Sequence, residues 1–365
     1  MTGDDKRGEG PTGRRPGARS ATIKDVAERA GVSIGTVSRV LNNTTRVNAQ
    51  KAERVREAVA ELNYVPNMAA QNMRRKTTRM VACILTDIGN PLYARLIAAV
   101  QRKLNDSDYS MVAMSTGNVE SRELAALATA RRYRFDGIVY ITGSQDRAEV
   151  NAAIAEVGIP TVQIEREKPD NDTFCVDHRQ GVRLAAEHLR AAGHSRIGVV
   201  TPGIGARPAA ARVDGFLALC AELGVTDGAD LVRQVQGPVD SGFNAAMALM
   251  RLASPPTAVI SLGSQLLAEV LQYMAAAGLA VPEDLSIVSI GDNELTRFGN
   301  PPISAIDWDF ARVGSDAAGR LLQRIDARRG GGPDDGPTIA RLYETRLIER
   351  RSVAAPKAPG RLHRG

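Results

Sequence analysis

The chain of 365 residues is 43% hydrophobic and 24% charged, which provides apolar material for two or three ordinary folded domains. No apolar run is long enough to cross a bilayer, and the first twenty residues lack the apolar stretch of a secretory signal. We therefore expect neither a membrane protein nor a secreted one. The formal net charge of +6 is concentrated in residues 21–80, and this excess points to a polyanionic partner for that segment alone.

The first predicted elements are two short helices that follow a polar arm. Residues 1–20 combine Gly, Pro and charge without apolar periodicity, which predicts a disordered basic arm. A helix is predicted to begin after Thr22, which can form a capping box with Asp25, and to end at Gly31. Ser33 can cap the start of a second helix whose inner face is apolar.

A third helix, predicted from about Asn48, ends before Pro66. Two short helices joined by a tight turn, with a third packing helix and a basic charge balance, describe a helix-turn-helix DNA-binding domain over residues 21–66. The pattern alone also allows a small helical bundle whose polar face is merely solvated. A short basic stretch, residues 67–79, then links this module to the rest of the chain.

Residues 80–351 alternate short apolar runs with amphipathic stretches, as in α/β proteins whose parallel sheets have crossover helices. Buried strands are predicted at 81–85, 109–114, 137–141, 161–164, 196–200, 257–261 and 285–290. Helices are predicted at 94–104, 122–132, 183–192, 209–223, 243–252 and 265–277. About 270 residues of this pattern exceed one ordinary sheet, so we expect two doubly wound subdomains. Residues 352–365 are predicted to be a disordered tail.

The outer face of the second helix carries side chains that suit a major groove. Arg39 has the planar fork that donates to guanine O6 and N7, and Ile34 could pack on a thymine methyl group. Gly35 has no side chain that could contact a base, but its small size allows the helix to approach the DNA closely. Contacts to phosphates, which position a protein without specifying sequence, are expected from Thr36, Ser38 and Asn42.

Two motifs in this module make the pattern specific: TIKDVAERAGVSIGTVSRVLN, and then YVPN. They resemble the DNA-binding head of the lactose-repressor (LacI-type) family of bacterial transcription regulators, nearly continuously from 22 to 67. The body resembles the family in segments such as DIGNPLY, FDGIVYI and NPPISAID, so the resemblance spans about residues 22–350. It implies a repressor with a body like periplasmic sugar-binding proteins, in which three crossovers join two subdomains around an effector cleft.

The resemblance also implies a hinge helix at residues 67–75 that enters the minor groove. Met73 stands where the family usually places a leucine that wedges between base pairs, and methionine is apolar and flexible enough for that role. The predicted DNA-contacting residues are therefore Thr22, Ser33, Ile34, Gly35, Thr36, Ser38, Arg39, Asn42, Asn67, Ala70 and Met73.

For the cleft, the resemblance implies an effector site formed by Tyr93, Glu165, Arg166, Arg212, Gln265, Asp292 and Trp308. Three departures put the usual sugar-hydroxyl contacts in doubt. Gly291 stands at the position of the family's effector-binding aspartate, 263–264 is Gly-Ser where Asn-Asp is common, and Gly237 stands where some members place an aromatic residue. Several of the polar candidates could instead be satisfied scaffold groups.

Other function classes have less support. A soluble solute-binding protein without a DNA role remains the alternative, and the helix-turn-helix argues against it. An α/β enzyme lacks a recognisable catalytic motif, and the scattered histidines and the three distant cysteines give no metal spacing, so we expect no cofactor and no metal.

We therefore expect a cytoplasmic, nucleoid-associated bacterial repressor controlled by a small-molecule effector, a sugar or sugar derivative. Its partner is a pseudo-palindromic double-stranded operator, and no membrane partner is expected. The protein should be a homodimer, because one three-helix head contacts too few phosphates and buries too little surface to hold an operator alone. A tetramer is not expected, because the proline-containing tail has no leucine heptad that could join two dimers.

Overall fold

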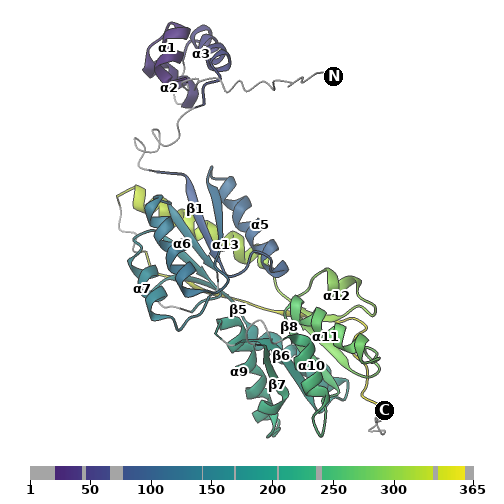
Figure 1. The fold of residues 1–365 in the computed structure, drawn as a ribbon. Helices are drawn as coiled ribbons and strands as arrows, with labels where there is room; N and C mark the ends of the chain where they lie inside the picture. The colour runs from purple at the N-terminus through teal and green to yellow at the C-terminus, as the bar shows by residue number, and fades with distance from the viewer. Residues whose placement is uncertain are drawn as a thin grey trace, which may run out of the picture. The chain divides into compact units, whose positions relative to one another are not determined.

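The computed structural model describes residues 21–42, 47–65, 77–141, 143–167, 170–203, 205–235, 241–331 and 336–357. The chain divides into two units, residues 1–76 and 77–365 (Figure 1). None of the described helices is long and apolar enough to span a bilayer.

The first unit contains three short helices around a small apolar core. Their bounds are α1 Ile23–Ala30, α2 Ile34–Asn42 and α3 Ala49–Glu61. The capping box is present, because the Thr22 hydroxyl accepts from the Asp25 backbone N–H while the Asp25 carboxylate accepts from the Thr22 N–H. Gly31 ends α1 in the left-handed conformation at φ 62°, which glycine adopts without a steric penalty. The predicted starts and stops of these helices are therefore confirmed.

The second unit, which we call the body, contains two lobes, each built on a six-stranded sheet within the described residues. The first sheet has the order β11-β5-β4-β3-β1-β2 and is parallel throughout. Its strands are β1 Met80–Leu85, β2 Ser110–Ser115, β3 Gly137–Ile141, β4 Thr161–Ile164, β5 Asp172–Val176 and β11 Ala340–Tyr343. The second has the order β12-β10-β9-β8-β6-β7, with β6 Ile197–Pro202, β7 Val232–Val235, β8 Ala258–Leu262, β9 Ser286–Ile290, β10 Ser304–Asp307 and β12 Arg346–Ile348.

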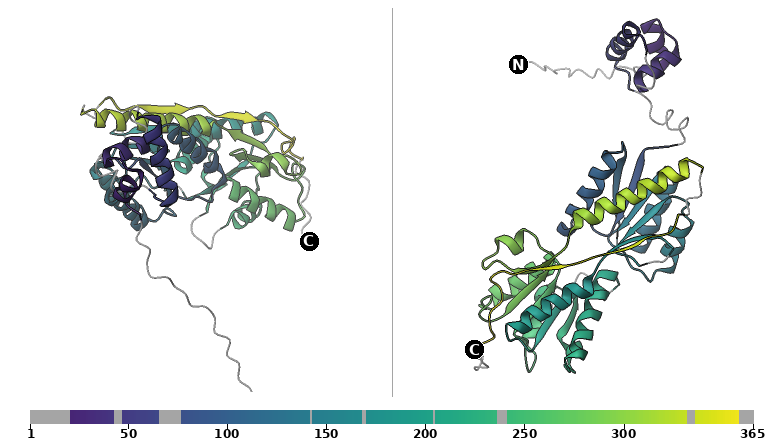
Figure 2. Two further views of the ribbon diagram at one scale, coloured as in Figure 1. Left: turned by 90° about the horizontal axis from the view of Figure 1, so that it is seen from above. Right: turned by 180° about the vertical axis from the view of Figure 1, so that it is seen from behind.

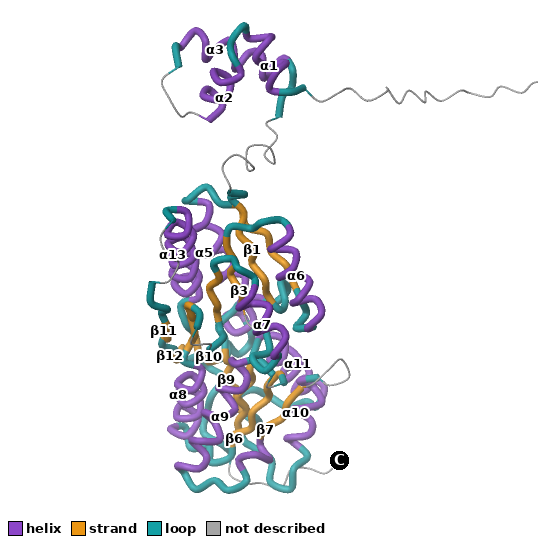
Figure 3. The backbone as a smooth tube through the Cα atoms, turned by 90° about the vertical axis from the view of Figure 1, so that its left-hand side faces the viewer, coloured by secondary structure: helices purple, strands orange, loops and turns teal. Residues whose placement is uncertain are grey.

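Helices cover both faces of each sheet (Figure 3). On the first lobe they are α5 Pro91–Asn105, α6 Glu120–Arg132, α7 Ala148–Glu156 and α13 Phe310–Arg329. On the second they are α8 His178–Ala191, α9 Arg207–Glu222, α10 Gly242–Met250, α11 Ser264–Ala276 and the short α12 Glu294–Phe298. Alternate residues of β1 serve different cores, since Cys83 packs with α5 and α13 whereas Ile84 packs with α6 and α7. This confirms the expected doubly wound sheets.

The chain passes between the lobes three times, as the resemblance implied. It leaves the first lobe after β5, returns after β10, and leaves again between β11 and β12. Figure 2 shows this last passage as a long yellow segment that runs beside both sheets. Three separate connections hold the lobes near one another.

Several elements were not predicted. Strands β7 and β11 lie at sheet edges and are half-buried or exposed, so their sequences lack a continuous apolar run. Helix α13 contains Gly314 and Gly319, which weaken its helical signal. One edge departs from the parallel expectation, because β12 pairs with β10 in the antiparallel sense.

Two segments next to predicted boundaries make contacts with the body. Residues 77–79, which we assigned to the linker, are held to the body because the Asp136 carboxylate accepts from the backbone N–H groups of Thr78 and Arg79 at 3.1 and 2.9 Å. Residues 352–357, which we assigned to the disordered tail, pack on the second lobe. The buried Ser352 hydroxyl donates to the Ile287 carbonyl at 2.6 Å.

The packing of α13 on α5 gives a testable contrast between two glycines of one helix. A Cβ at Gly314 would lie 2.6 Å from the Leu96 carbonyl oxygen, whereas a Cβ at Gly319 would meet nothing closer than Lys103 Cε at 3.7 Å. We expect Gly314→Ala to destabilise the body by about 1–3 kcal/mol through overpacking. Gly319→Ala should instead stabilise it by up to about 1 kcal/mol, because alanine favours a helix. Urea unfolding followed by circular dichroism measures both, and equal shifts in midpoint would contradict the packing.

Candidate DNA-reading helix and effector pocket

Helix α2 presents an exposed face opposite its buried Val37. Ile34, Gly35 and Arg39 are exposed on that face, and the Arg39 Nε donates to the Gly35 carbonyl at 3.1 Å. On this face the exposed guanidinium could donate to a base edge, and the exposed isoleucine could contact a thymine methyl group.

The other predicted DNA contacts are partly outside the described residues. Ser33 is exposed and accepts from the Thr36 backbone N–H, while Thr22, Thr36 and Ser38 are half-buried. The side chain of Asn42 lies outside the described residues, as do Asn67, Ala70 and Met73.

A cavity of about 540 Å³ lies between the two lobes of the body. It is lined by loops that follow parallel strands of both sheets, where ligands of open α/β sheets usually bind. Four of the predicted effector residues line it: Tyr93, Glu165, Arg212 and Trp308. We call this cavity the pocket.

A buried polar network forms one side of the pocket. Glu165 follows β4 in the first lobe, and its carboxylate accepts from His178 Nε2 at 3.1 Å, from Arg207 Nη1 at 3.1 Å and from the Val176 N–H at 3.1 Å. The opposite imidazole nitrogen, His178 Nδ1, faces Arg212 Nε and Nη2 at 3.3 and 3.1 Å. A guanidinium can only donate, so Nδ1 accepts and Nε2 carries the proton that Glu165 receives.

The electrostatics agree with this tautomer. Burial, with Arg212 next in effect, lowers the pKa of His178 to about 4, so the imidazole is neutral at pH 7. Burial alone would raise the pKa of Glu165, but His178, Arg207 and Arg212 together lower it below its ordinary value, which keeps the carboxylate ionised. Burial also lowers the pKa of Arg212 to about 10, which still leaves it protonated at pH 7.

Aromatic rings form the neighbouring wall. Trp308 contacts Phe310 edge to face with ring centroids 5.1 Å apart, and Tyr93 contacts Phe310 in the same way at 6.4 Å. The Arg212 guanidinium carbon lies 5.8 Å from the centre of the Trp308 ring. A cation and flat apolar surfaces therefore lie side by side in the pocket.

Arg166 was predicted as an effector contact, but its placement makes it a scaffold residue. Its side chain has no solvent exposure and does not line the pocket. The guanidinium donates to the Ser144 carbonyl at 2.9 Å and to Asn151 Oδ1 at 2.6 Å, and it lies over the Tyr140 ring. These guanidinium donors are bound to acceptors within the first lobe.

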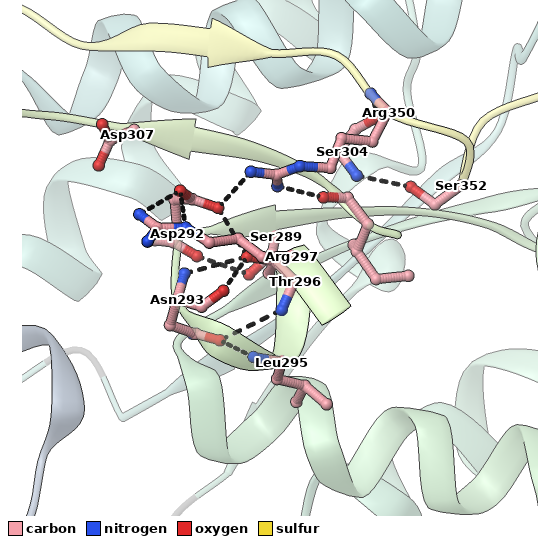
Figure 4. Close-up of polar contacts among 12 residues, drawn as sticks. Ser289, Asp292, Asn293, Leu295, Thr296, Arg297, Ser304, Asp307, Arg350 and Ser352 are labelled. Atoms are coloured by element: carbon pink, nitrogen blue, oxygen red, sulfur yellow. Dashed lines mark hydrogen bonds and ion pairs between the residues drawn. The ribbon is translucent and has the colours of Figure 1, made fainter. Parts of the chain in front are cut away.

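Asp292 was also predicted as an effector contact, and its carboxylate lies outside the lining of the pocket. It accepts from Thr296 Oγ1 at 2.7 Å, Arg297 Nε at 2.8 Å and Arg350 Nη2 at 2.7 Å, a cluster within the second lobe (Figure 4). The adjacent Gly291 has φ 108°, and a Cβ there would lie 2.8 Å from Leu92 Cδ2. Packing thus explains why a side chain is missing at that position.

Gln265 is exposed outside the pocket lining and donates to Glu269 Oε1 at 3.3 Å, so its placement does not fit an effector contact either. Sequence reasoning missed His178 and Arg207, which complete the Glu165 network. His178 begins α8 directly after strand β5. Because β5 was not predicted, nothing in the sequence indicated that His178 lies at the end of a strand. The described residues contain no group of His, Cys, Asp or Glu side chains arranged for a metal ion.

Comparisons with known proteins match two different parts of the chain to two families. Residues 22–67 match the family model described as bacterial regulatory proteins, lacI family, and residues 186–353 match a periplasmic binding protein-like domain. The HTH-type transcriptional regulator DegA of Bacillus subtilis is 30% identical over 81% of this chain and 88% of its own length. The ribose operon repressor of Haemophilus influenzae is 30% identical over 84% of this chain and 92% of its own.

A solved structure of the Lac repressor dimer bound to operator and the anti-inducer ONPF is also similar. Its TM-score is 0.78 at 27% sequence identity, and the alignment covers 92% of this chain and all of that one.

The cluster around Asp292 predicts a loss of stability without a change in the pocket. Asp292→Ala leaves two arginines near a vacated buried site, so we expect about 3 kcal/mol of destabilisation. Asp284→Ala, which removes a partly exposed ion pair with Lys357 and a hydrogen bond from the Ala280 N–H, should cost only about 1 kcal/mol. Thermal unfolding of both variants tests this, and an Asp292→Ala protein as stable as Asp284→Ala would refute the scaffold role.

Proposed function

The chain belongs to the lacI family of bacterial regulatory proteins, and we propose that it is a transcriptional repressor whose affinity for operator DNA is set by a small molecule bound in the pocket. The family membership supplies the DNA-binding role. The observation that carries the control by a ligand is the pocket itself, because it lies between two lobes that the chain joins through three crossovers.

The DNA-binding part of the proposal places α2 in the major groove, with Arg39 as the base reader and Ile34 beside it. Such a head is small, so we propose a homodimer that places two recognition helices on a pseudo-palindromic operator. The similarity to a repressor dimer bound to operator supports this arrangement. We assign minor-groove contacts to Asn67, Ala70 and Met73, following the resemblance, and we place the protein with the bacterial chromosome in the cytoplasm.

The effector part of the proposal rests on linkage. A ligand changes operator affinity only if it binds the two arrangements of the lobes with different affinity. Side chains from both lobes and from the crossovers line the pocket, so a change in their spacing changes the contacts that a ligand makes. A ribose operon repressor and a repressor bound to the anti-inducer ONPF are among the similar proteins, which supports a small organic effector.

The two alternatives have less support. A solute-binding protein without a DNA role would not account for the match of residues 22–67 to a regulator family. The named relatives are regulators and not enzymes, which favours a protein that binds its ligand without transforming it.

Selection of duplexes from a random pool by the full chain tests the function. We expect a two-fold symmetric consensus, and we expect Arg39→Ala to lose about 1–3 kcal/mol of specific binding and to relax preference at one base pair in each half-site. Arg56→Ala, which removes an exposed arginine from α3, is the matched control and should leave the consensus unchanged. An Arg39→Ala protein with the original base preference would contradict the assignment of α2.

A further inference from the structure

Basic side chains are concentrated where three helices of the first lobe end. The last turns of α5, α6 and α13 each contain two of them, which are Arg102 and Lys103, Arg131 and Arg132, and Arg328 and Arg329. Arg134 follows α6 directly. Lys103 is half-buried and the other six residues are exposed. We call these seven residues the basic face.

The first residues of the body lie between these three helix ends. Arg329 at the end of α13 donates to the Thr77 hydroxyl. The Thr78 hydroxyl donates to a backbone carbonyl just past α6 at 2.9 Å, and the Arg79 guanidinium donates to one just past α5 at 3.0 Å. The right-hand view of Figure 2 shows the yellow-green α13 ending at the end of the lobe where the blue β1 begins. The chain that leads to the three-helix head therefore leaves the body from within the basic face.

The cations of the basic face have few carboxylate partners. Arg329 pairs with Asp136 at 2.8 Å, and the other six form no ion pair within the described part of the chain. The acidic side chains of the same segments are Asp106, Asp108, Asp136 and Asp326. Seven cations therefore accompany four carboxylates. On the second lobe, exposed arginines such as Arg179 and Arg183 are instead paired with carboxylates.

Helix dipoles alone do not explain this distribution. The unpaired carbonyls in the last turn of any helix favour a nearby cation. Yet α7, α9, α10 and α11 have no basic residue in their last turn, and α8 and α12 have one arginine each. The pairs of cations occur on the three helix ends that surround the start of the body.

We propose that the basic face binds backbone phosphates of the operator, as a second DNA contact besides the three-helix head. This inference rests on the proposed function, in which the head holds a duplex. Residues 66–76 separate the described parts of the head and the body, and eleven residues span at most about 40 Å, so a bound duplex is close to this face.

The charge of DNA suits such a contact. A duplex carries one negative charge for about every 1.7 Å of its axis, which complements a group of exposed cations without carboxylate partners. Contacts to phosphates add affinity and position the protein, but they do not read bases. The basic face should therefore strengthen operator binding without changing which sequence is preferred.

The salt dependence of binding measures phosphate contacts, because each contact releases counterions and adds about 0.9 to the slope of log affinity against log salt concentration. The full-length protein is titrated onto its selected operator by fluorescence anisotropy, in potassium chloride from about 50 to about 300 mM. The triple variant Arg131→Gln/Arg132→Gln/Arg134→Gln removes three exposed charges of the basic face. We expect its slope to be smaller by at least about 1 and its affinity in about 0.1 M salt to be about tenfold weaker, with an unchanged base consensus.

A matched control separates a local contact from the effect of net charge. Arg190→Gln/Arg251→Gln/Arg351→Gln removes the same charge from exposed positions of the second lobe. It should leave the slope unchanged, because salt screens charges that lie more than about 10 Å from the DNA. Arg102→Gln/Lys103→Gln at the end of α5 is a second variant of the basic face and should also lower the slope. Circular dichroism and thermal unfolding establish that each variant is folded.

The outcomes separate this inference from the proposed function. A lower slope in either variant of the basic face, with an unchanged slope in the control, supports the phosphate contact. Unchanged slopes in both variants, or an equal decrease in the control, overturn it while the proposed function stands, and unchanged slopes leave an acidic protein as the partner to test. If the wild type selects no duplex, the proposed function fails and this inference fails with it.

Discussion

Glu165 connects the two lobes of the body through hydrogen bonds that reach the end of β5, the start of α8 and the start of α9. It has φ 60°, a left-handed conformation that costs a residue other than glycine of order 1 kcal/mol. The carboxylate is buried and ionised, so each bond that it accepts also offsets the cost of removing its charge from water. This single group holds His178 in the tautomer whose Nδ1 accepts from Arg212, and so it positions the Arg212 guanidinium at the wall of the pocket.

The arrangement explains how a ligand site can influence distant parts of such a chain. Glu165 belongs to the first lobe, whereas Arg207 and Arg212 belong to α9 in the second. A ligand that contacts Arg212 and the aromatic wall would touch both lobes and a crossover at once. Its binding energy can therefore depend on how the lobes are spaced, which is the requirement for a change in operator affinity. Arg166 and Asp292 have a different role, since each stabilises the interior of one lobe.

Sequence reasoning predicted the elements that depend on local signals. The caps at Thr22 and Gly31 and the apolar strands of both sheets follow from chemistry within a few residues. The edge strands β7, β11 and β12, the inner strand β5 and the glycine-containing α13 were not predicted, because their formation depends on tertiary packing. Among pocket residues, Tyr93, Glu165, Arg212 and Trp308 were found through the resemblance. Whether an arginine or aspartate faces a cavity or a scaffold partner depends on contacts that are distant in sequence, and so Arg166, Asp292 and the role of His178 could not be predicted.

The central claim is that the Glu165–Arg207 pair fastens the two lobes, and a double-mutant cycle tests it directly. Glu165→Gln, Arg207→Gln and the double variant are compared with the wild type by the free energy of unfolding of the body. Each single substitution should cost about 3 kcal/mol, because it removes one partner of a buried ion pair. The double variant should cost at least about 1 kcal/mol less than the sum of the two. Strictly additive losses would show that the pair does not act as a unit and would contradict the account.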